Sequence, residues 1–186
     1  MIIAFTGAGI SRESGIATFM EQPDVRDRLY RSYATDYPES YNETIKQLHD
    51  VVSHAGPNDA HYALSDYNIP VITMNIDGLH EACGTDTMTL HGTLPSEDEL
   101  SHANTLWNKP VLYGDPAPNY HKAMQKIDKL GSDDILLVIG ASRHTAIAVE
   151  IRELAHSNGV EIIEIQENAV IEVRETLLNL QEKGRL

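Results

Sequence analysis

The opening of the chain constrains its fold more than any other stretch. An apolar, β-branched run at Ile2–Thr6 passes directly into the small-residue turn Gly7-Ala8-Gly9. In an open α/β fold the first strand ends where a helix begins, and glycines there let backbone N–H groups approach a pyrophosphate. The stretch predicts a phosphate-binding turn. An ordinary tight turn is the alternative, because the strict dinucleotide fingerprint has glycine where this chain has Arg12.

The rest of the chain alternates short apolar runs with helical patterns. Further strands are predicted at Pro70–Thr73, Val111–Tyr113, Ile135–Ile139 and Val160–Ile165. Helices are predicted at Ala60–Tyr67, Pro118–Leu130, Ala146–Ser157 and Ala169–Glu182. Strands that alternate with helices favour a parallel sheet with right-handed crossovers. We therefore expect an α/β fold, with a Rossmann-like parallel sheet and helices on both of its faces.

Two polar regions, residues 20–56 and 93–110, interrupt this alternation. The first is long enough for two or three short helices, and the second begins with Pro95-Ser96-Glu97, which is typical of the start of a single helix. We expect both insertions to leave the sheet where its strands end and to form a reduced small domain. The Rossmann-like core then comprises residues 1–19, 57–92 and 111–186, and the chain is a single domain.

Composition excludes several classes of function. The 28 acidic and 14 basic residues give a formal net charge of −14, which argues against a nucleic-acid or anionic-membrane partner. A single cysteine, Cys83, excludes an intrachain disulfide and a zinc site of four cysteines. No segment approaches the ~20 apolar residues of a membrane span, and no signal-peptide pattern occurs. We expect a cytoplasmic protein without zinc.

Polar residues follow two of the apolar segments. Asn75 and Asp77 come directly after Pro70–Thr73, where an amide and a carboxylate can hydrogen-bond a ribose or a carboxamide; an Asx turn is the alternative. His91 precedes Gly92 after another short apolar stretch and has the chemistry of a general base near neutral pH. Since the chain has nine histidines, chance placement is the alternative for His91.

Together these segments resemble the sirtuin family, the NAD-dependent protein deacylases. The matching stretches follow one another in the family's order and span most of the chain: residues 7–20, 57–64, 73–80, 91–92, 111–115, 140–142 and 165–166. The resemblance implies one catalytic domain that uses NAD as a cosubstrate.

The resemblance also implies a role for individual residues. The catalytic residues would be His91 as the base, with Asn75 and Asp77 positioning the reactive ribose. The residues that bind NAD would be Gly7, Ala8, Gly9, Ser14, Ile16, Phe19, Asn75, Ile76, Asp77, Gly140, Ala141, Ser142 and Gln166. The residues that bind the acylated peptide would be Val111, Tyr113, Gly114 and Asp115.

The activity implied is the transfer of an acyl group from a protein or peptide lysine to ADP-ribose, with release of nicotinamide. An NAD hydrolase or ADP-ribosyltransferase using the same pocket is one alternative, and a non-catalytic NAD or ADP-ribose sensor is another. The chain departs from the family at Met20 and Met74, where arginine and glutamine are usual, and it lacks the cysteines of the zinc ribbon. We expect Trp107, in the shortened segment, to anchor what replaces that ribbon or to line the peptide cleft. The oligomeric state stays open.

Overall fold

A computed structural model describes residues 1–18 and 21–186 of the protein. Its strands form one parallel sheet in the order β3-β2-β1-β4-β5. They are β1 (Ile2–Thr6), β2 (Val71–Thr73), β3 (Thr87–Thr89), β4 (Ile135–Ile139) and β5 (Glu161–Ile165). Strands β2 and β3 follow one another on one side of β1, whereas β4 and β5 follow one another on its other side. The direction of the strand order therefore reverses between β1 and β4. In open α/β sheets, ligands bind outside the carboxyl ends at such a switch point.

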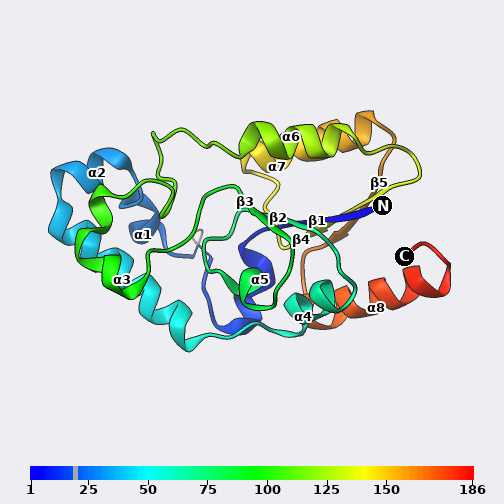
Figure 1. Ribbon diagram of the computed structural model, residues 1–186, viewed down its shortest axis with the longest axis horizontal. Helices are drawn as coiled ribbons and strands as arrows, with labels where there is room; N and C mark the ends of the chain where they lie inside the picture. The colour runs from blue at the N-terminus through cyan, green and yellow to red at the C-terminus, as the bar shows by residue number, and fades with distance from the viewer. Residues whose placement is uncertain (19–20) are drawn as a thin grey trace.

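Helices cover both faces of the sheet, as expected (Figure 1). On one face lie α6 (Tyr120–Asp128) and α7 (Ala146–Ser157), and on the other lie α4 (Asp59–Asp66) and α8 (Ala169–Glu182). A short helix, α5 (Leu79–Ala82), connects β2 to β3. The α/β prediction from the sequence is therefore confirmed.

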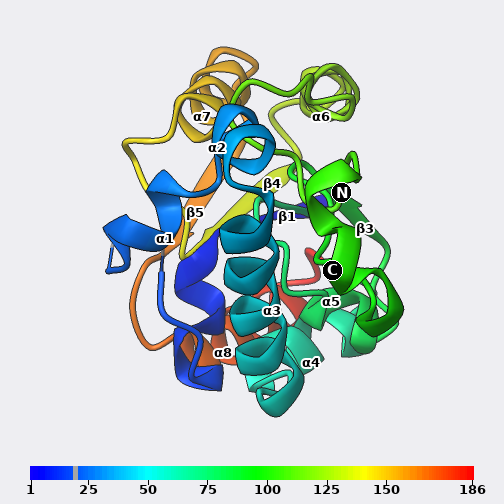
Figure 2. The same ribbon diagram turned by 90° about the vertical axis from the view of Figure 1, so that its left-hand side faces the viewer.

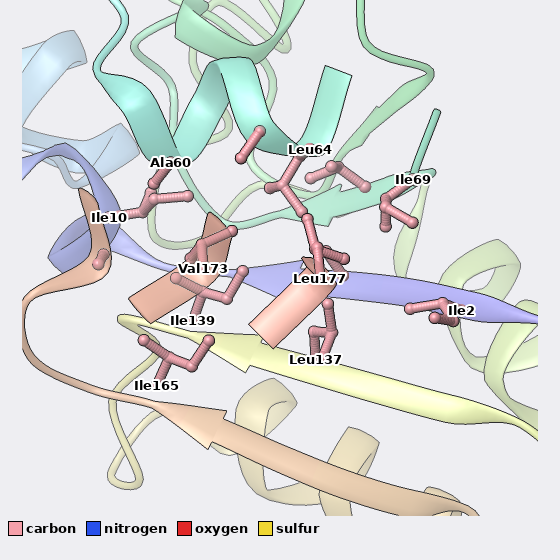
Figure 3. Close-up of a cluster of buried hydrophobic side chains, with 14 of the residues drawn as sticks. Ile2, Ile10, Ala60, Leu64, Ile69, Leu137, Ile139, Ile165, Val173 and Leu177 are labelled. Carbon is pink, nitrogen blue, oxygen red and sulfur yellow. The ribbon is translucent and has the colours of Figure 1, made fainter. Parts of the chain in front are cut away.

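The two cores share strand β1. Because side chains alternate along a strand, Ile2 and Ala4 pack with α4 and α8, whereas Ile3 and Phe5 pack with α6 and α7. Figure 3 shows the first cluster, in which side chains of α4 and α8 meet those of β1, β4 and β5. The residues of β1 are buried throughout, which explains why this strand reads as a continuous apolar run.

A third group of helices gathers at the carboxyl ends of the strands (Figures 1 and 2). It contains α1 (Pro23–Asp27), α2 (Arg31–Asp36), α3 (Pro38–His54) and the 3-10 helix η2 (Glu97–Thr105). These elements have a small core of their own, made of Leu29, Ala34, Tyr41, Ile45, Ala103 and Leu112. We call this part the small unit. Because Leu112 belongs to this core, the segment after residue 110 also packs against the small unit. The sequence analysis had instead assigned residues from 111 onward to the Rossmann-like core.

Most predicted elements are observed within two residues of their expected ends, but four local features differ. The predicted strand Val111–Tyr113 is wrong, because Tyr113 forms only an isolated bridge with Tyr30 of the small unit. Strand β3 was missed, since Thr87–Thr89 is short, half-buried and lacks an apolar run. Helix α3 is long rather than short, with 17 residues. The second insertion has the expected cap at its start, yet it forms a 3-10 helix broken at His102.

Arg31, the first residue of α2, connects the segments of the small unit by hydrogen bonds. Its Nε and Nη2 donate to the two carboxylate oxygens of Asp115 at 2.8 and 2.6 Å. Its Nη1 and Nη2 also donate to the carbonyls of Asn104 and Leu106, and the guanidinium lies 4.4 Å from the centre of the Trp107 ring. The Arg31 side chain is 19% exposed and that of Asp115 1%, so this bidentate pair is largely shielded from water. One side chain therefore joins both insertions to the segment that follows them.

We predict that Arg31→Ala lowers the free energy of unfolding of the small unit by about 3–5 kcal/mol, because the buried Asp115 carboxylate loses its cation. Chemical denaturation, with hydrogen exchange resolved over residues 23–54 and 97–115, measures the loss. Arg26→Ala is the matched control, since Arg26 pairs with Asp27 at the exposed surface and should change little. Equal protection of the small unit in both variants would contradict the role given to Arg31.

Candidate functional site

The glycine turn after β1 packs directly against the turn after β4. The N–H groups of Gly7 and Gly9 donate to the carbonyls of Ile139 and Gly140, each at 3.0 Å. A Cβ on Gly9 would lie 2.6 Å from Gly140 Cα, and one on Gly7 would lie 2.7 Å from Ala141 Cα. Gly140 has a φ of +58° and equally little room. Glycine is therefore required for the contact between these two backbones. The predicted phosphate-binding turn thus meets the predicted NAD-binding segment at residues 140–142 at the switch point.

A chain of side-chain hydrogen bonds links that turn to the loop after β2. Ser11, in the 3-10 helix η1 (Ala8–Ser14), donates from Oγ to Asp77 Oδ2 at 2.7 Å. Asn75 Nδ2 donates to the same Oγ at 3.2 Å. Asp77 Oδ1 accepts from the N–H of Leu79 at 3.0 Å, so the Asx turn offered as the alternative is also present. Ser11 thus holds Asn75 and Asp77 together, and the sequence analysis did not select it.

Two buried histidines lie beneath this network. The rings of His61 on α4 and His80 on α5 have centroids 4.8 Å apart. His61 Nε2 lies 3.5 Å from Ser11 Oγ, and His80 Nε2 lies 3.0 Å from Thr6 Oγ1 at the end of β1. Burial lowers the pKa of His61 to about 4 and that of His80 to about 3. Both rings are therefore neutral near pH 7 and add no charge below Asp77.

His91 follows β3 and has a defined tautomer. Its Nδ1 lies 3.0 Å from the carbonyl oxygen of Met74, and because a carbonyl only accepts, Nδ1 carries the proton. The lone pair is therefore on Nε2, which lies 2.7 Å from the hydroxyl of Tyr120. Burial lowers the pKa of His91, and the hydrogen bond to Met74 partly offsets that effect. A neutral imidazole with its lone pair at the sheet edge has the form that a general base needs.

Several predicted cofactor-binding residues surround this centre at the other strand ends. Ser14 accepts a hydrogen bond from Asn58, Ser142 accepts one from the N–H of His144, and Gln166 donates to Glu164. Ile16 is half-buried, and Ala8 opens η1. Phe19 and the altered position Met20 lie outside the described residues. The other altered residue, Met74, packs against the core beneath α6 and α7.

Helix α3 borders two hollows beside these residues. One, of about 210 Å³, lies between α3 and the loop after β2, and Ile76, Asp77 and Leu94 are among its lining residues. The other, of about 550 Å³, lies between the carboxyl end of α3 and Ser14-Gly15. The backbone N–H of Leu94 donates to Ile76 at 3.0 Å, which attaches the second insertion to the Asn75–Asp77 loop. Space for a ligand is thus available next to Asp77.

The predicted peptide-binding segment lies beside His91. The N–H of Val111 donates to the His91 carbonyl at 2.8 Å, and Gly114 has a φ of +96°. Tyr113 stacks on Tyr30 with ring centroids 4.8 Å apart, and it is 52% exposed. Asp115 instead points into the small unit, where Arg31 holds it. Of these residues, Tyr113 has a side chain exposed to solvent in the segment bonded to His91. The buried Asp115 holds the same segment against the small unit through Arg31.

Comparison with known proteins agrees with this arrangement. The model of the Sir2 family matches residues 7–98. The NAD-dependent protein deacylase of Thermococcus sibiricus is 31% identical over 205 residues, which cover 88% of this chain and 79% of that protein. The chain belongs to the Sir2 family, the sirtuins. This sirtuin is also 32% identical to the NAD-dependent protein deacetylase of Thermodesulfovibrio yellowstonii, over 87% of its own chain and 77% of the relative.

Solved structures of Sir2 proteins share the fold. A Sir2 homologue in complex with NAD superimposes with a TM-score of 0.81 at 22% identity, covering 98% of this chain and 90% of that one. A Sir2 complex with a p53 peptide and NAD⁺ gives a TM-score of 0.74 at 21% identity, covering 99% and 93%. The Rossmann-like sheet and the attached small unit of this sirtuin therefore have the Sir2 arrangement.

We predict that acid destabilises the protein through its buried histidines. Histidines of the unfolded chain titrate near pH 6.5, above the folded pKa values of about 4 for His61 and about 3 for His80. The unfolded state then binds more protons in this window, so the free energy of unfolding falls by about 1.4 kcal/mol per pH unit for each histidine as pH falls from about 6 to 4. Urea denaturation across this range measures the slope. His61→Gln should flatten it, whereas a variant of the exposed His121, His121→Gln, should not; equal slopes would contradict the assignment.

Proposed function

We propose that this sirtuin is an NAD-dependent protein lysine deacylase that transfers the acyl group to ADP-ribose and releases nicotinamide. One observation carries the proposal: the neutral His91 keeps its lone pair on Nε2, at the strand ends where Asn75 and Asp77 also lie. The names of the relatives, NAD-dependent protein deacylase and deacetylase, support the same activity.

The strand ends fit a dinucleotide. The glycines of the turns after β1 and β4 leave no side chains at their contact, which suits the close approach of a pyrophosphate at a switch point. We assign NAD binding to the residues predicted from the sequence, namely Gly7, Ala8, Gly9, Ser14, Ile16, Phe19, Asn75, Ile76, Asp77, Gly140, Ala141, Ser142 and Gln166. Bound NAD supplies a ribose carbon from which nicotinamide can leave.

The protein side chains bind, orient and accept a proton. Asn75 and Asp77 hold the ribose and the carboxamide, and Ser11 keeps both side chains in place through its bonds of 3.2 and 2.7 Å. His91 Nε2 accepts a proton from a ribose hydroxyl as general base. Because its pKa is lowered, the imidazole stays unprotonated near pH 7 without help from a carboxylate.

The acylated substrate would lie along Val111, Tyr113, Gly114 and Asp115. The hydrogen bond from Val111 to the His91 carbonyl places this segment next to the base, and the solved Sir2 complex with a p53 peptide supports a peptide substrate. The net charge of −14 favours a cationic, lysine-rich partner. This segment distinguishes a deacylase from an NAD hydrolase or a sensor, neither of which needs a peptide beside the base.

By the resemblance, the second insertion replaces the zinc ribbon of other sirtuins, and Arg31 donates to two carbonyls of this insertion. We infer that this tie between the insertions and Asp115 does the structural work of the metal. Among residues 1–18 and 21–186, no cluster of three or more histidine, cysteine, aspartate or glutamate side chains is placed to hold a metal ion. None of the described helices has the length and apolarity to cross a bilayer. Independence from zinc and a cytoplasmic location stay predictions.

Incubation with NAD and a panel of acyl-lysine peptides tests the function, with free nicotinamide and peptide mass followed together. Coupled release of both products is expected. Nicotinamide without deacylated peptide would replace the proposal by an NAD hydrolase or transferase, and NAD binding without either product would replace it by a sensor.

We predict that His91→Ala lowers the deacylation rate by about 10²- to 10⁴-fold, because the proton acceptor is lost, while NAD binding measured by calorimetry is retained. His156→Ala is the matched control, because His156 is exposed near the end of α7. Full activity of the His91 variant would remove this residue from the mechanism.

A further inference from the structure

Both nitrogens of His91 are already engaged within the protein. A neutral imidazole offers one donor and one acceptor. The donor, Nδ1, is used by the carbonyl of Met74 at 3.0 Å, and the acceptor, Nε2, faces the hydroxyl of Tyr120 at 2.7 Å. The Tyr120 hydroxyl is the donor in this pair, because the only proton of the ring is on Nδ1. A substrate hydroxyl therefore cannot reach the lone pair until Tyr120 gives it up.

The position of Tyr120 is set by a contact with β3, the strand that precedes His91. Tyr120 is the first residue of α6, and Asn119 just before it donates from Nδ2 to the carbonyl of Thr89 at 2.8 Å. Thr89 ends β3, two residues before His91. The centroids of the Tyr120 and His91 rings are 5.8 Å apart and the rings are tilted by 49°. The pair is thus built from the segment after β3 and the start of α6, and it does not depend on a free surface side chain.

The surroundings keep Tyr120 protonated. Burial raises its pKa, and the nearby Tyr113 of the small unit and Glu150 of α7 act in the same direction. No charged side chain is among the causes that shift the pKa of His91, which are burial and the Met74 carbonyl. Near pH 7 the hydroxyl therefore keeps the proton that it donates to Nε2.

We propose that Tyr120 is a positioning residue that caps His91, holding Nε2 covered until a substrate hydroxyl displaces the phenol. The role of the cap in turnover rests on the proposed function of His91 as base, whereas the cap itself is a property of the protein alone. The phenol hydroxyl occupies the lone pair of Nε2, so the cap competes with the substrate for this atom.

The cap is tested first without any substrate. In protein labelled with ¹⁵N-histidine, the signals of His91 are assigned by their loss in His91→Ala and followed against pH. The wild-type Nε2 signal should show the shift of a nitrogen that accepts a hydrogen bond. In Tyr120→Phe it should move, at pH values where His91 is neutral, to that of a free nitrogen. Tyr62→Phe, at an exposed tyrosine of α4, should leave it unchanged. An unshifted wild-type Nε2 signal, or equal Nε2 signals in Tyr120→Phe and wild type, would overturn the proposal.

Kinetics then test the competition. In Tyr120→Phe the KM for NAD should fall roughly 2- to 10-fold, the range set by one neutral hydrogen bond, with kcat little changed. An unchanged KM in Tyr120→Phe would overturn the cap as a competitor of the substrate. If no peptide is deacylated by wild type but the NMR shifts occur, the proposed function fails and the cap stands.

Discussion

The contact between the turns after β1 and β4 is the constraint on which the site depends. Gly9 and Gly140 approach so closely that either one would clash with the other's backbone if it carried a side chain. This approach lets the two central strands end at the same level, and Ser11 then lies within reach of Asp77. Because a side chain at Gly9 or Gly140 would force the start of η1 away from the turn after β4, the position of Ser11 beside Asp77 depends on these glycines.

A different kind of interaction holds the small unit. The sheet is stabilised by two apolar cores, whereas the small unit has a modest apolar cluster and relies on the fork of Arg31 for the connections between its segments. Such a fork fixes direction as well as distance, because each N–H aims at one acceptor. It keeps Tyr113 and Val111 aligned with His91 even though no regular strand pairing does so.

The features that could be predicted from the sequence are those that depend on the local pattern of residues. The buried strands, the four long core helices and the glycine turns were recognisable because each depends on residues close together in the chain. The expected placement of Asn75 and Asp77 at a strand end also followed from the order of elements, whereas the strand before His91, β3, was missed. What could not be predicted is partner choice across the fold: Arg31 with Asp115, Ser11 with Asp77, and Tyr120 with His91. The residues next to a tyrosine or an arginine in the sequence do not indicate which distant residue it will contact. The false strand at Val111–Tyr113 has the right composition, but the sheet offers it no neighbour.

The strand order also determines when the sheet can close. Ile2 of β1 lies opposite Ile135 of β4, and every residue of the small unit named above is synthesised between these two strands. While a ribosome makes this chain, β1 can pair on one side with β2, but its other edge keeps unpaired backbone groups until β4 emerges. An apolar strand with an open edge is prone to pair with other chains. One edge of β1 thus stays open to such pairing even after the small unit is complete, until residue 139 has left the ribosome.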